Sequence, residues 1–379
     1  MSVPFNKPFT TGAELRYVQE AIEAGALAGD GAFTKRCHAW IEREMRSKKA
    51  LLTHSCTAAL EMCALLLDVQ PGDEIIMPSY TFVSTANAFV LRGAVPVFVD
   101  VRADTLNLDE RLVEAAITPK TKAICVVHYA GVACEMDAIL EIAARHRLPV
   151  VEDDAQGCMS LYKGRPLGGL GALGAISFHE TKNIISGEGG ALLVNDERYA
   201  ARAEILWQKG TNRQAFFRGE VDKYSWVDVG SSFLAGELTA AFLWAQMEDA
   251  EAITQARLAL WQRYDDALEL HEQAGALRRP IVPADRTHNA HMFYVLLPDL
   301  AARTAAIAAL KKKGYGAVFH YVPLHSSPAG RRFGRVSGVM TVTDDIADRV
   351  LRLPLWVGLP PEAVDAVVTT LIDALRAAR

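Results

Sequence analysis

Between about residues 50 and 200, short apolar runs alternate with stretches in which apolar residues recur at helical spacing. The apolar runs predict strands at Glu74–Pro78, Val95–Val99, Ala123–Val127, Pro149–Glu152, Ala175–Phe178 and Ala191–Val194. The periodic stretches predict helices at Ala58–Leu67, Phe82–Arg92, Leu112–Ile117 and Met136–His146. Such alternation predicts an α/β fold in which helices cover a mostly parallel sheet.

The pattern changes after residue 200. A loop-rich region at Gly210–Gly230 precedes one long helical stretch, Gly236–Glu272, which we expect to leave a large domain and enter a smaller one. The remainder mixes the two periodicities and predicts strands at His291–Leu296 and Gly316–His320 and helices at Thr304–Lys313 and Pro361–Arg376. We therefore predict a large domain of residues 1–245, with an N-terminal arm, and a smaller C-terminal α+β domain of residues 246–379.

Composition limits the classes of protein that fit. The 379 residues are 50% hydrophobic and 22% charged, with a net charge of −5, which argues against a nucleic-acid partner. No charge-free apolar run reaches the ~18 residues of a membrane span, and the N-terminus lacks the apolar core of a signal peptide. The six cysteines have no metal-type spacing and are expected to be reduced thiols, which predicts a cytoplasmic location.

A lysine and an aspartate stand at the ends of two predicted strands. Lys182 follows the strand that begins at Ala175, and Asp153 ends an earlier one. Ligands of parallel sheets bind at this edge. Alone, Lys182 is typical of a surface lysine and Asp153 of a helix cap. Together they fit pyridoxal phosphate, which needs a lysine amine for covalent attachment and a carboxylate beside its ring nitrogen. Lys182 would then also move the substrate proton.

The other groups near this edge are less specific. Ser55–Ala58 begins a helix, where free N–H groups and the helix dipole favour a phosphate, although a plain N-cap explains it equally. Ser177 could donate a hydroxyl, and Phe82 could stack on the pyridine ring or belong to the core. Gly169–Gly174 matches a dinucleotide-binding pattern but lacks the preceding strand and following helix, so we expect a tight loop. His288 and His291 lack further ligands, so we predict no metal site.

Several segments together resemble the sugar-nucleotide aminotransferases of pyridoxal-phosphate fold type I, of the DegT/StrS type. The similarity runs from Phe5–Pro8 to Leu353–Leu355 and includes Pro71–Glu74, Thr105–Asn107, Ala116–Pro119, Glu152–Asp153, Lys182–Asn183 and Gly187–Gly190. Three segments are similar to the subgroup that aminates dTDP-4-keto-6-deoxyglucose at C4: His128–Asp137, Ser177–Asn183 and Phe319–His325. A sister group that dehydrates sugars carries histidine where Lys182 stands.

The resemblance implies a role for each matching residue. Lys182 would bind the cofactor covalently and Asp153 would pair with its ring nitrogen. The remaining cofactor contacts would be Gln156 at the ring hydroxyl, Phe82 on the ring face, and Thr57, Ala58 and Ser177 at the phosphate. The resemblance also implies a homodimer with shared active sites. Many relatives place an asparagine at the position of Leu234, so Ser231 or Ser232, with Ser232 preferred, would replace its contact with the partner's phosphate. Asp154 stands where alanine is usual, and we expect its side chain to point away from Asp153.

The implied reaction is a transamination in which pyridoxamine phosphate carries the amino group. L-glutamate is the expected donor and dTDP-4-keto-6-deoxy-D-glucose the acceptor, giving dTDP-4-amino-4,6-dideoxy-D-galactose or its D-glucose epimer. The alternative is amination at C3 of a dTDP-3-keto-6-deoxyhexose. His320 and Tyr321 would line the sugar site. Lys209, Arg213 and Arg218 would hold the diphosphate, across the dimer or within one chain, unless they form a solvated basic loop.

Overall fold

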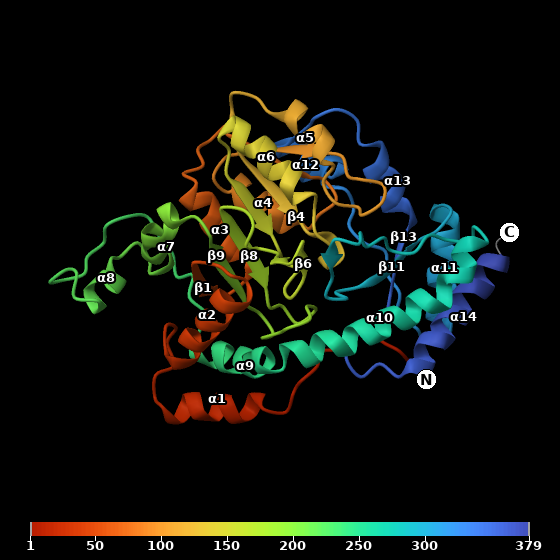
Figure 1. Ribbon diagram of the computed structural model, residues 1–379, viewed down its shortest axis with the longest axis horizontal. Coiled ribbons are helices and arrows are strands. Elements are labelled where there is room, and N and C mark those ends of the chain that lie inside the picture. The colour runs from red at the N-terminus through yellow and green to blue at the C-terminus, as the bar shows by residue number, and fades with distance from the viewer. Residues whose placement is uncertain (1, 378–379) are drawn as a thin grey trace.

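The computed structural model describes residues 2–377, and an eight-stranded sheet forms its centre (Figure 1). In spatial order the strands are β1 (Lys49–Thr53), β9 (Gly190–Val194), β8 (Leu173–Ser177), β5 (Val150–Asp153), β4 (Thr121–Val127), β2 (Glu74–Pro78), β3 (Val95–Val99) and β12 (Arg335–Val336). Every neighbouring pair from β8 to β12 is parallel, and β9 runs antiparallel to both β1 and β8. The predicted mostly parallel sheet is confirmed.

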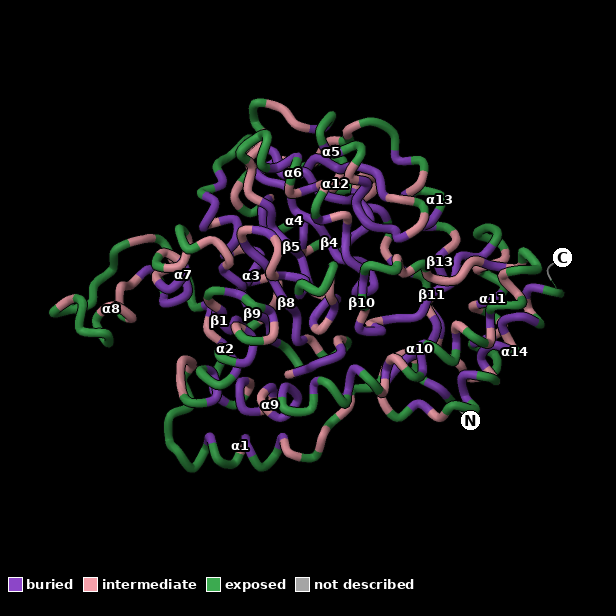
Figure 2. The backbone as a smooth tube through the Cα atoms, in the orientation of Figure 1, coloured by how far each residue is buried: buried purple, intermediate pink, exposed green. Residues whose placement is uncertain are grey.

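Helices cover both faces of this sheet, and the strands are therefore apolar on both sides. On one face, Leu192 and Val194 of β9 pack with α3 (Cys56–Leu66), α4 (Val83–Val90) and α7 (Ala200–Trp207). On the other, Ala191 and Leu193 pack with α2 (Ala32–Glu44) and α9 (Glu237–Glu248). The same second face meets α5 (Glu110–Ala116) and α6 (Met136–His146) near β2, β3 and β4. Helix α1 (Glu14–Glu23) packs on α9. The central strands are mostly buried, whereas the helices expose much of their outer sides, as α1 shows (Figure 2).

The C-terminal part has its own hydrophobic core. Strands β11 (Phe293–Leu296) and β13 (Val350–Leu353) pair antiparallel beneath α10 (Ala250–Gln273), α11 (Leu300–Lys312) and α14 (Pro361–Ala377). Val3 of the N-terminal arm belongs to this core. The shorter elements are β6 (Leu161–Tyr162), β7 (Arg165–Pro166), β10 (Arg286–Thr287), α8 (Arg213–Phe217), α12 (Pro328–Phe333) and α13 (Thr341–Arg349). The domain boundary between residues 245 and 246 stays a prediction.

Two predicted elements differ in the structure. The long helical stretch is two helices, because Asp249 leaves the helical conformation (φ −101°, ψ 12°) and separates α9 from α10. The break lets α9 pack on α1 and α2 while α10 packs on α14. The strand predicted at Gly316–His320 is wrong: only Val318 pairs with a neighbouring strand, through a single bridge to Arg352. Within residues 2–377, no helix has the length and apolar character needed to cross a bilayer.

Candidate active site

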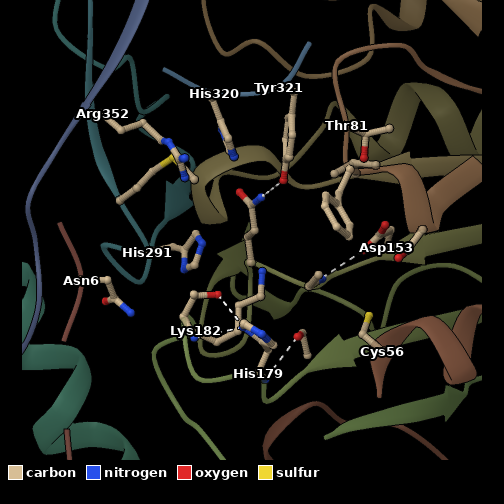
Figure 3. A pocket seen from close by; sticks show the side chains of 18 of the residues that line it. Asn6, Cys56, Thr81, Asp153, His179, Lys182, His291, His320, Tyr321 and Arg352 are labelled. Carbon is tan, nitrogen blue, oxygen red and sulfur yellow. Dashed lines mark hydrogen bonds between the residues drawn. The ribbon is translucent and has the colours of Figure 1, made fainter. Parts of the chain in front are cut away.

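A cavity of about 700 Å³ opens at the carboxyl ends of β5 and β8, between the central sheet and the C-terminal part (Figure 3). Asp153 and Ser177 are the last residues of these two strands, and Lys182 lies on the loop after β8. The cavity brings together most residues predicted for the site: Thr57, Phe82, Asp153, Gln156, Ser177, Lys182, His320 and Tyr321. The edge at which parallel strands end therefore holds the chemistry, as the topology predicts.

The loop between β8 and β9 positions Lys182. Its backbone is held by bonds from Phe178 N–H to the Gly189 carbonyl (2.9 Å) and from Glu180 N–H to the Gly187 carbonyl (2.8 Å). Gly187 has φ +80°, a conformation that favours glycine and closes the turn. Burial lowers the pKa of the Lys182 amine, because desolvation disfavours the ammonium ion. A larger share of neutral amine makes Lys182 a better nucleophile and base.

Asp153 is a buried carboxylate with one oxygen firmly held. The Thr85 hydroxyl donates a hydrogen bond of 2.6 Å to Oδ2, and the Ala155 N–H donates one of 3.3 Å to Oδ1. Burial raises the pKa of Asp153, while these two hydrogen bonds act in the opposite direction. A carboxylate in this setting is stabilised most by a nearby cation. Sequence reasoning missed Thr85, which lies buried in the first turn of α4, just after the N-cap residue Phe82.

The N-terminus of α3 forms the other end of the cavity. Ser55 is its N-cap, since its hydroxyl accepts a 3.1 Å hydrogen bond from the Ala58 N–H. The Thr57 hydroxyl bonds to that of Ser84 at 2.8 Å. Gly190 lets the helix start lie against β9, because a Cβ there would sit 2.4 Å from the Cys56 nitrogen. Ala58 is buried behind the cavity wall and its N–H is already engaged, so its phosphate role stays a prediction.

Aromatic rings form the wall opposite Lys182. The Tyr129 hydroxyl and His320 Nδ1 are hydrogen-bonded at 2.8 Å, and the ring of His320 stacks on that of Tyr321 with centroids 3.7 Å apart. Gln156 ties this wall to the sheet. Its Oε1 accepts from the Ala130 N–H (2.7 Å) and its Nε2 donates to the Tyr321 hydroxyl (2.8 Å). The predicted contact of Gln156 with the cofactor hydroxyl stays a prediction. Burial lowers the pKa of His320 well below its ordinary value, so the imidazole is neutral.

Three further residues line the cavity and were not predicted. His291, which the sequence suggested was merely packed, bonds through Nδ1 to Asn183 Oδ1 at 3.1 Å. Arg257 donates to the carbonyls of Ala290 (3.1 Å) and His291 (2.7 Å). Arg352 enters from β13. The position of Asn183 directly after Lys182 was the one sequence signal for His291, and nothing in the sequence pattern marked either arginine.

The remaining predicted residues lie elsewhere. Lys209, Arg213 and Ser232 line a second pocket of about 610 Å³ together with Lys35 and Asp30. We call this second pocket the basic pocket. It shares no lining residue with the Lys182 cavity. Arg218 lines neither, because its guanidinium pairs with Glu204 (2.9 Å) and Glu220 (2.7 Å). Within one chain, the predicted diphosphate residues are therefore not brought to the lysine.

The glycine run forms a loop, as predicted, and this loop encloses an acid. The Glu152 carboxylate accepts hydrogen bonds from the N–H groups of Gly168 (2.9 Å), Leu170 (2.7 Å) and Gly171 (2.6 Å). The same carboxylate bonds to His128 Nε2 at 2.9 Å. Because side chains alternate along a strand, Glu152 and Asp154 point to the side opposite Asp153. The expectation that Asp154 points away from the cofactor site is confirmed by its absence from the cavity wall.

Residues 9–372 match the DegT/DnrJ/EryC1/StrS aminotransferase family. The chain belongs to this family. It is 33% identical over 384 residues to the spore coat polysaccharide biosynthesis protein SpsC of Bacillus subtilis strain 168, covering 99% of this chain and 98% of the relative.

Solved structures agree with this assignment. The aminotransferase TlmJ from Streptoalloteichus hindustanus has a TM-score of 0.91 at 30% identity, covering 100% of both chains. Spr1654 from Streptococcus pneumoniae, described as a sugar aminotransferase and solved in a pyridoxal-phosphate form, has a TM-score of 0.89 at 26% identity, again covering 100% of both chains. This chain is a pyridoxal-phosphate-dependent sugar aminotransferase.

The residues of the cavity fit this cofactor. The amine of Lys182 and the carboxylate of Asp153 line the same cavity, the latter being the buried acid that a ring nitrogen requires. The start of α3, closely approached by Gly190, provides backbone N–H groups for a phosphate. When bound, pyridoxal phosphate supplies the electron sink that makes the Cα proton of an amino donor removable. Lys182, which lines the same cavity, would then be the base that takes this proton and returns it.

Asp154 departs from the alanine expected in this family, and it carries a cost. Both of its carboxylate oxygens are buried without a hydrogen-bond partner. Burial raises the pKa of Asp154 well above its ordinary value of 3.8. A raised pKa in the folded state favours folding when the group is protonated and disfavours it once the unfolded chain can ionise. The penalty is therefore absent below about pH 3.8, grows as the pH rises, and becomes constant above the raised pKa.

Replacing Asp154 with alanine should stabilise the aminotransferase at neutral pH. We expect Asp154→Ala to raise the free energy of unfolding at pH 7 by about 1 to 2 kcal/mol, since an unsatisfied buried polar group is removed. The gain should shrink as the pH is lowered toward 4. Urea unfolding at several pH values measures both effects. Asp154→Asn, which keeps the shape but cannot ionise, is the control for the pH dependence. If Asp154→Ala raised the free energy of unfolding by the same amount at every pH, ionisation of Asp154 would not be the cause of its cost in stability.

Proposed function

We propose that this sugar aminotransferase transfers the amino group of L-glutamate to C4 of dTDP-4-keto-6-deoxy-D-glucose. The observation that carries the proposal is the meeting of three segments at or next to one cavity. These segments, which resemble the C4-aminating subgroup, are His128–Asp137, Ser177–Asn183 and Phe319–His325. The last two contribute Lys182 and His320 to the cavity lining, and Tyr129 of the first holds His320 by a 2.8 Å hydrogen bond from outside that lining. Residues that resemble the subgroup are thus concentrated where an acceptor sugar would meet the amine.

The cavity has the character of a sugar site. Its volume of about 700 Å³ lies in the range of sites for small ligands. Phe82, with 56% of its surface exposed, and the stacked pair His320–Tyr321 offer apolar faces. The Tyr321 hydroxyl and the His320 imidazole offer polar atoms beside those faces. Lys182 would deliver a proton to C4, and these groups would orient the hexose ring.

We further propose that the enzyme works as a homodimer in which the basic pocket of one copy completes the cavity of the other. Lys35, Lys209 and Arg213 form no ion pair in the described part of the chain, although all three line the basic pocket. The adjoining segment 210–230 projects from the molecule (Figure 1) and exposes Phe217 (60%) and Trp226 (81%). Unpaired cations suit a sugar-nucleotide diphosphate, and the exposed aromatic rings suit burial against a second copy.

The proposed reaction is tested with a pair of acceptors. Purified enzyme with pyridoxal phosphate and L-glutamate is given dTDP-4-keto-6-deoxy-D-glucose or the 3-keto isomer. We expect amination of the 4-keto sugar, with the 3-keto isomer converted about 100-fold more slowly because its carbonyl is displaced from the amine. Proton couplings of the product identify the aminated carbon and distinguish the D-galacto from the D-gluco epimer. Preferred conversion of the 3-keto isomer would overturn the C4 assignment in favour of the C3 alternative.

A further inference from the structure

A half-buried arginine without a counter-ion faces the active-site cavity. Arg352 extends from β13 into the cavity wall, on the side opposite Asp153, with Lys182 between them in the view of Figure 3. Its guanidinium lies 4.8 Å from the centre of the Phe5 ring, and Nη2 donates one hydrogen bond of 3.1 Å to the Phe319 carbonyl. Its Nε is buried without a partner. In the described chain, Arg352 forms no ion pair.

Among residues 2–377, no acid is placed to neutralise this charge. The carboxylates that line the cavity in this part of the chain are those of Asp153 and Glu188. Asp153 is engaged by Thr85 and lies on the far side, and Glu188 is exposed near His179. The ionisable groups near Arg352 are the hydroxyls of Tyr80, Tyr129 and Tyr321, together with the basic groups of His291, His320 and Lys182. The other arginine of the cavity, Arg257, is occupied by two backbone carbonyls. Arg352 is therefore the cavity cation with N–H groups left for a ligand.

The anions of the reaction can be divided among the available cations and N–H groups. The cofactor phosphate fits the start of α3, on the sheet side of the cavity. The acceptor's diphosphate fits the basic pocket in the proposed dimer. The amino donor brings carboxylates, which match the planar fork of a guanidinium and gain from an arginine that is already partly desolvated.

We propose that Arg352 binds a carboxylate of the amino donor. This inference rests on the proposed use of an amino acid such as L-glutamate, but it does not depend on which sugar accepts the amino group. The donor would lie between Arg352 and Lys182, with its amino group toward the lysine and a carboxylate on the arginine. Arg352 then selects α-amino acids over amines that lack a carboxylate.

The test uses glutarate, which carries both carboxylates of glutamate but no amine and so binds without reacting. Calorimetric titration of the holoenzyme should give about 10- to 100-fold weaker glutarate binding for Arg352→Met. Arg352→Lys should recover part of the affinity, because it keeps the charge and loses the fork. Arg303→Met is the matched control, since Arg303 likewise lies over a phenylalanine ring, that of Phe319, but does not line the cavity. That variant should bind glutarate as the unaltered enzyme does.

A second measurement separates this inference from the acceptor assignment. Without any acceptor, glutamate alone converts the lysine-bound cofactor, and the rate of this half-reaction is measured at increasing glutamate concentrations. In Arg352→Met, the glutamate concentration that gives half of the maximal rate should rise about 10- to 100-fold. The affinity of the variant for dTDP should stay unchanged. Failure of the 4-keto sugar to react would leave both results as predicted, so it would overturn only the proposed function. Unchanged glutarate affinity in Arg352→Met, or an equal loss of dTDP affinity, would overturn the role of Arg352.

Discussion

The Lys182→Ala enzyme should lose transamination activity by a factor on the order of 10⁴, since we propose that this side chain both attaches the cofactor and moves the substrate proton. The visible absorbance of covalently bound pyridoxal phosphate should disappear with it. Both measurements follow from one position in the structure: a buried amine with a lowered pKa, on a loop held to β8 and β9. Initial rates and an absorbance spectrum of the purified variant check the expectation.

The loss should come from chemistry and not from unfolding. Burial disfavours the charged amine of Lys182, so alanine removes a group that costs stability in the absence of cofactor. We therefore expect the melting temperature of the cofactor-free variant to equal or exceed that of the unaltered protein. Lys120→Ala is the control, because Lys120 is exposed after α5 and lies outside the cavity. A Lys182→Ala enzyme that kept both absorbance and turnover would refute the assignment of the lysine.

Arg213→Ala should raise the KM for the sugar nucleotide by about 10- to 100-fold, because a charge-assisted contact to the diphosphate is lost. The variant also tests whether sites are shared. Mixed dimers of Arg213→Ala and Lys182→Ala chains contain one site in which both residues are intact if Arg213 acts on the partner's cavity. After equal mixing and exchange of subunits at low sugar-nucleotide concentration, about a quarter of the unaltered activity should then appear.

The comparison with Arg218 separates the basic pocket from general surface charge. Arg218 belongs to the same segment but is paired with Glu204 and Glu220 outside the basic pocket. Arg218→Ala should change the KM by less than about 2-fold, as expected for an exposed, already paired charge. Mixtures of the Arg213→Ala and Lys182→Ala chains that stay no more active than their separate components would rule out a contribution of Arg213 across the dimer.

The parallel-sheet side of the site was predictable because strand ends share an edge. Asp153 and Ser177 end β5 and β8, and apolar runs bounded by turns mark those strands in the sequence. The position of Asp154 followed from alternation along β5 in the same way. Sequence periodicity did not reveal the break at Asp249, which separates α9 from α10. That break depends on which helices each half packs against.

Residues that reach the cavity from far along the chain were the ones not found. These residues are far in sequence from the groups they meet. Thr85 is hydrogen-bonded to Asp153, His291 is hydrogen-bonded to Asn183, and Arg352 lines the same cavity as Asp153. An isolated arginine before Leu353 looks the same whether its guanidinium is solvated or enclosed. The donor-binding proposal depends on the fact that Arg352 has no counter-ion. That fact can be seen only once the positions of all neighbouring side chains are known.

The sequence by itself determined the fold class, the strand ends and the family to which the chain belongs, and it singled out the lysine and aspartate that we propose for the cofactor site. It did so because periodicity and local motifs are short-range properties. Only the tertiary structure decided that Lys209 and Arg213 form a pocket apart from Lys182, that Arg218 is already paired, and that Arg352 faces the cavity unpaired. Those outcomes depend on burial and on distances between segments remote in sequence, which the order of residues does not express.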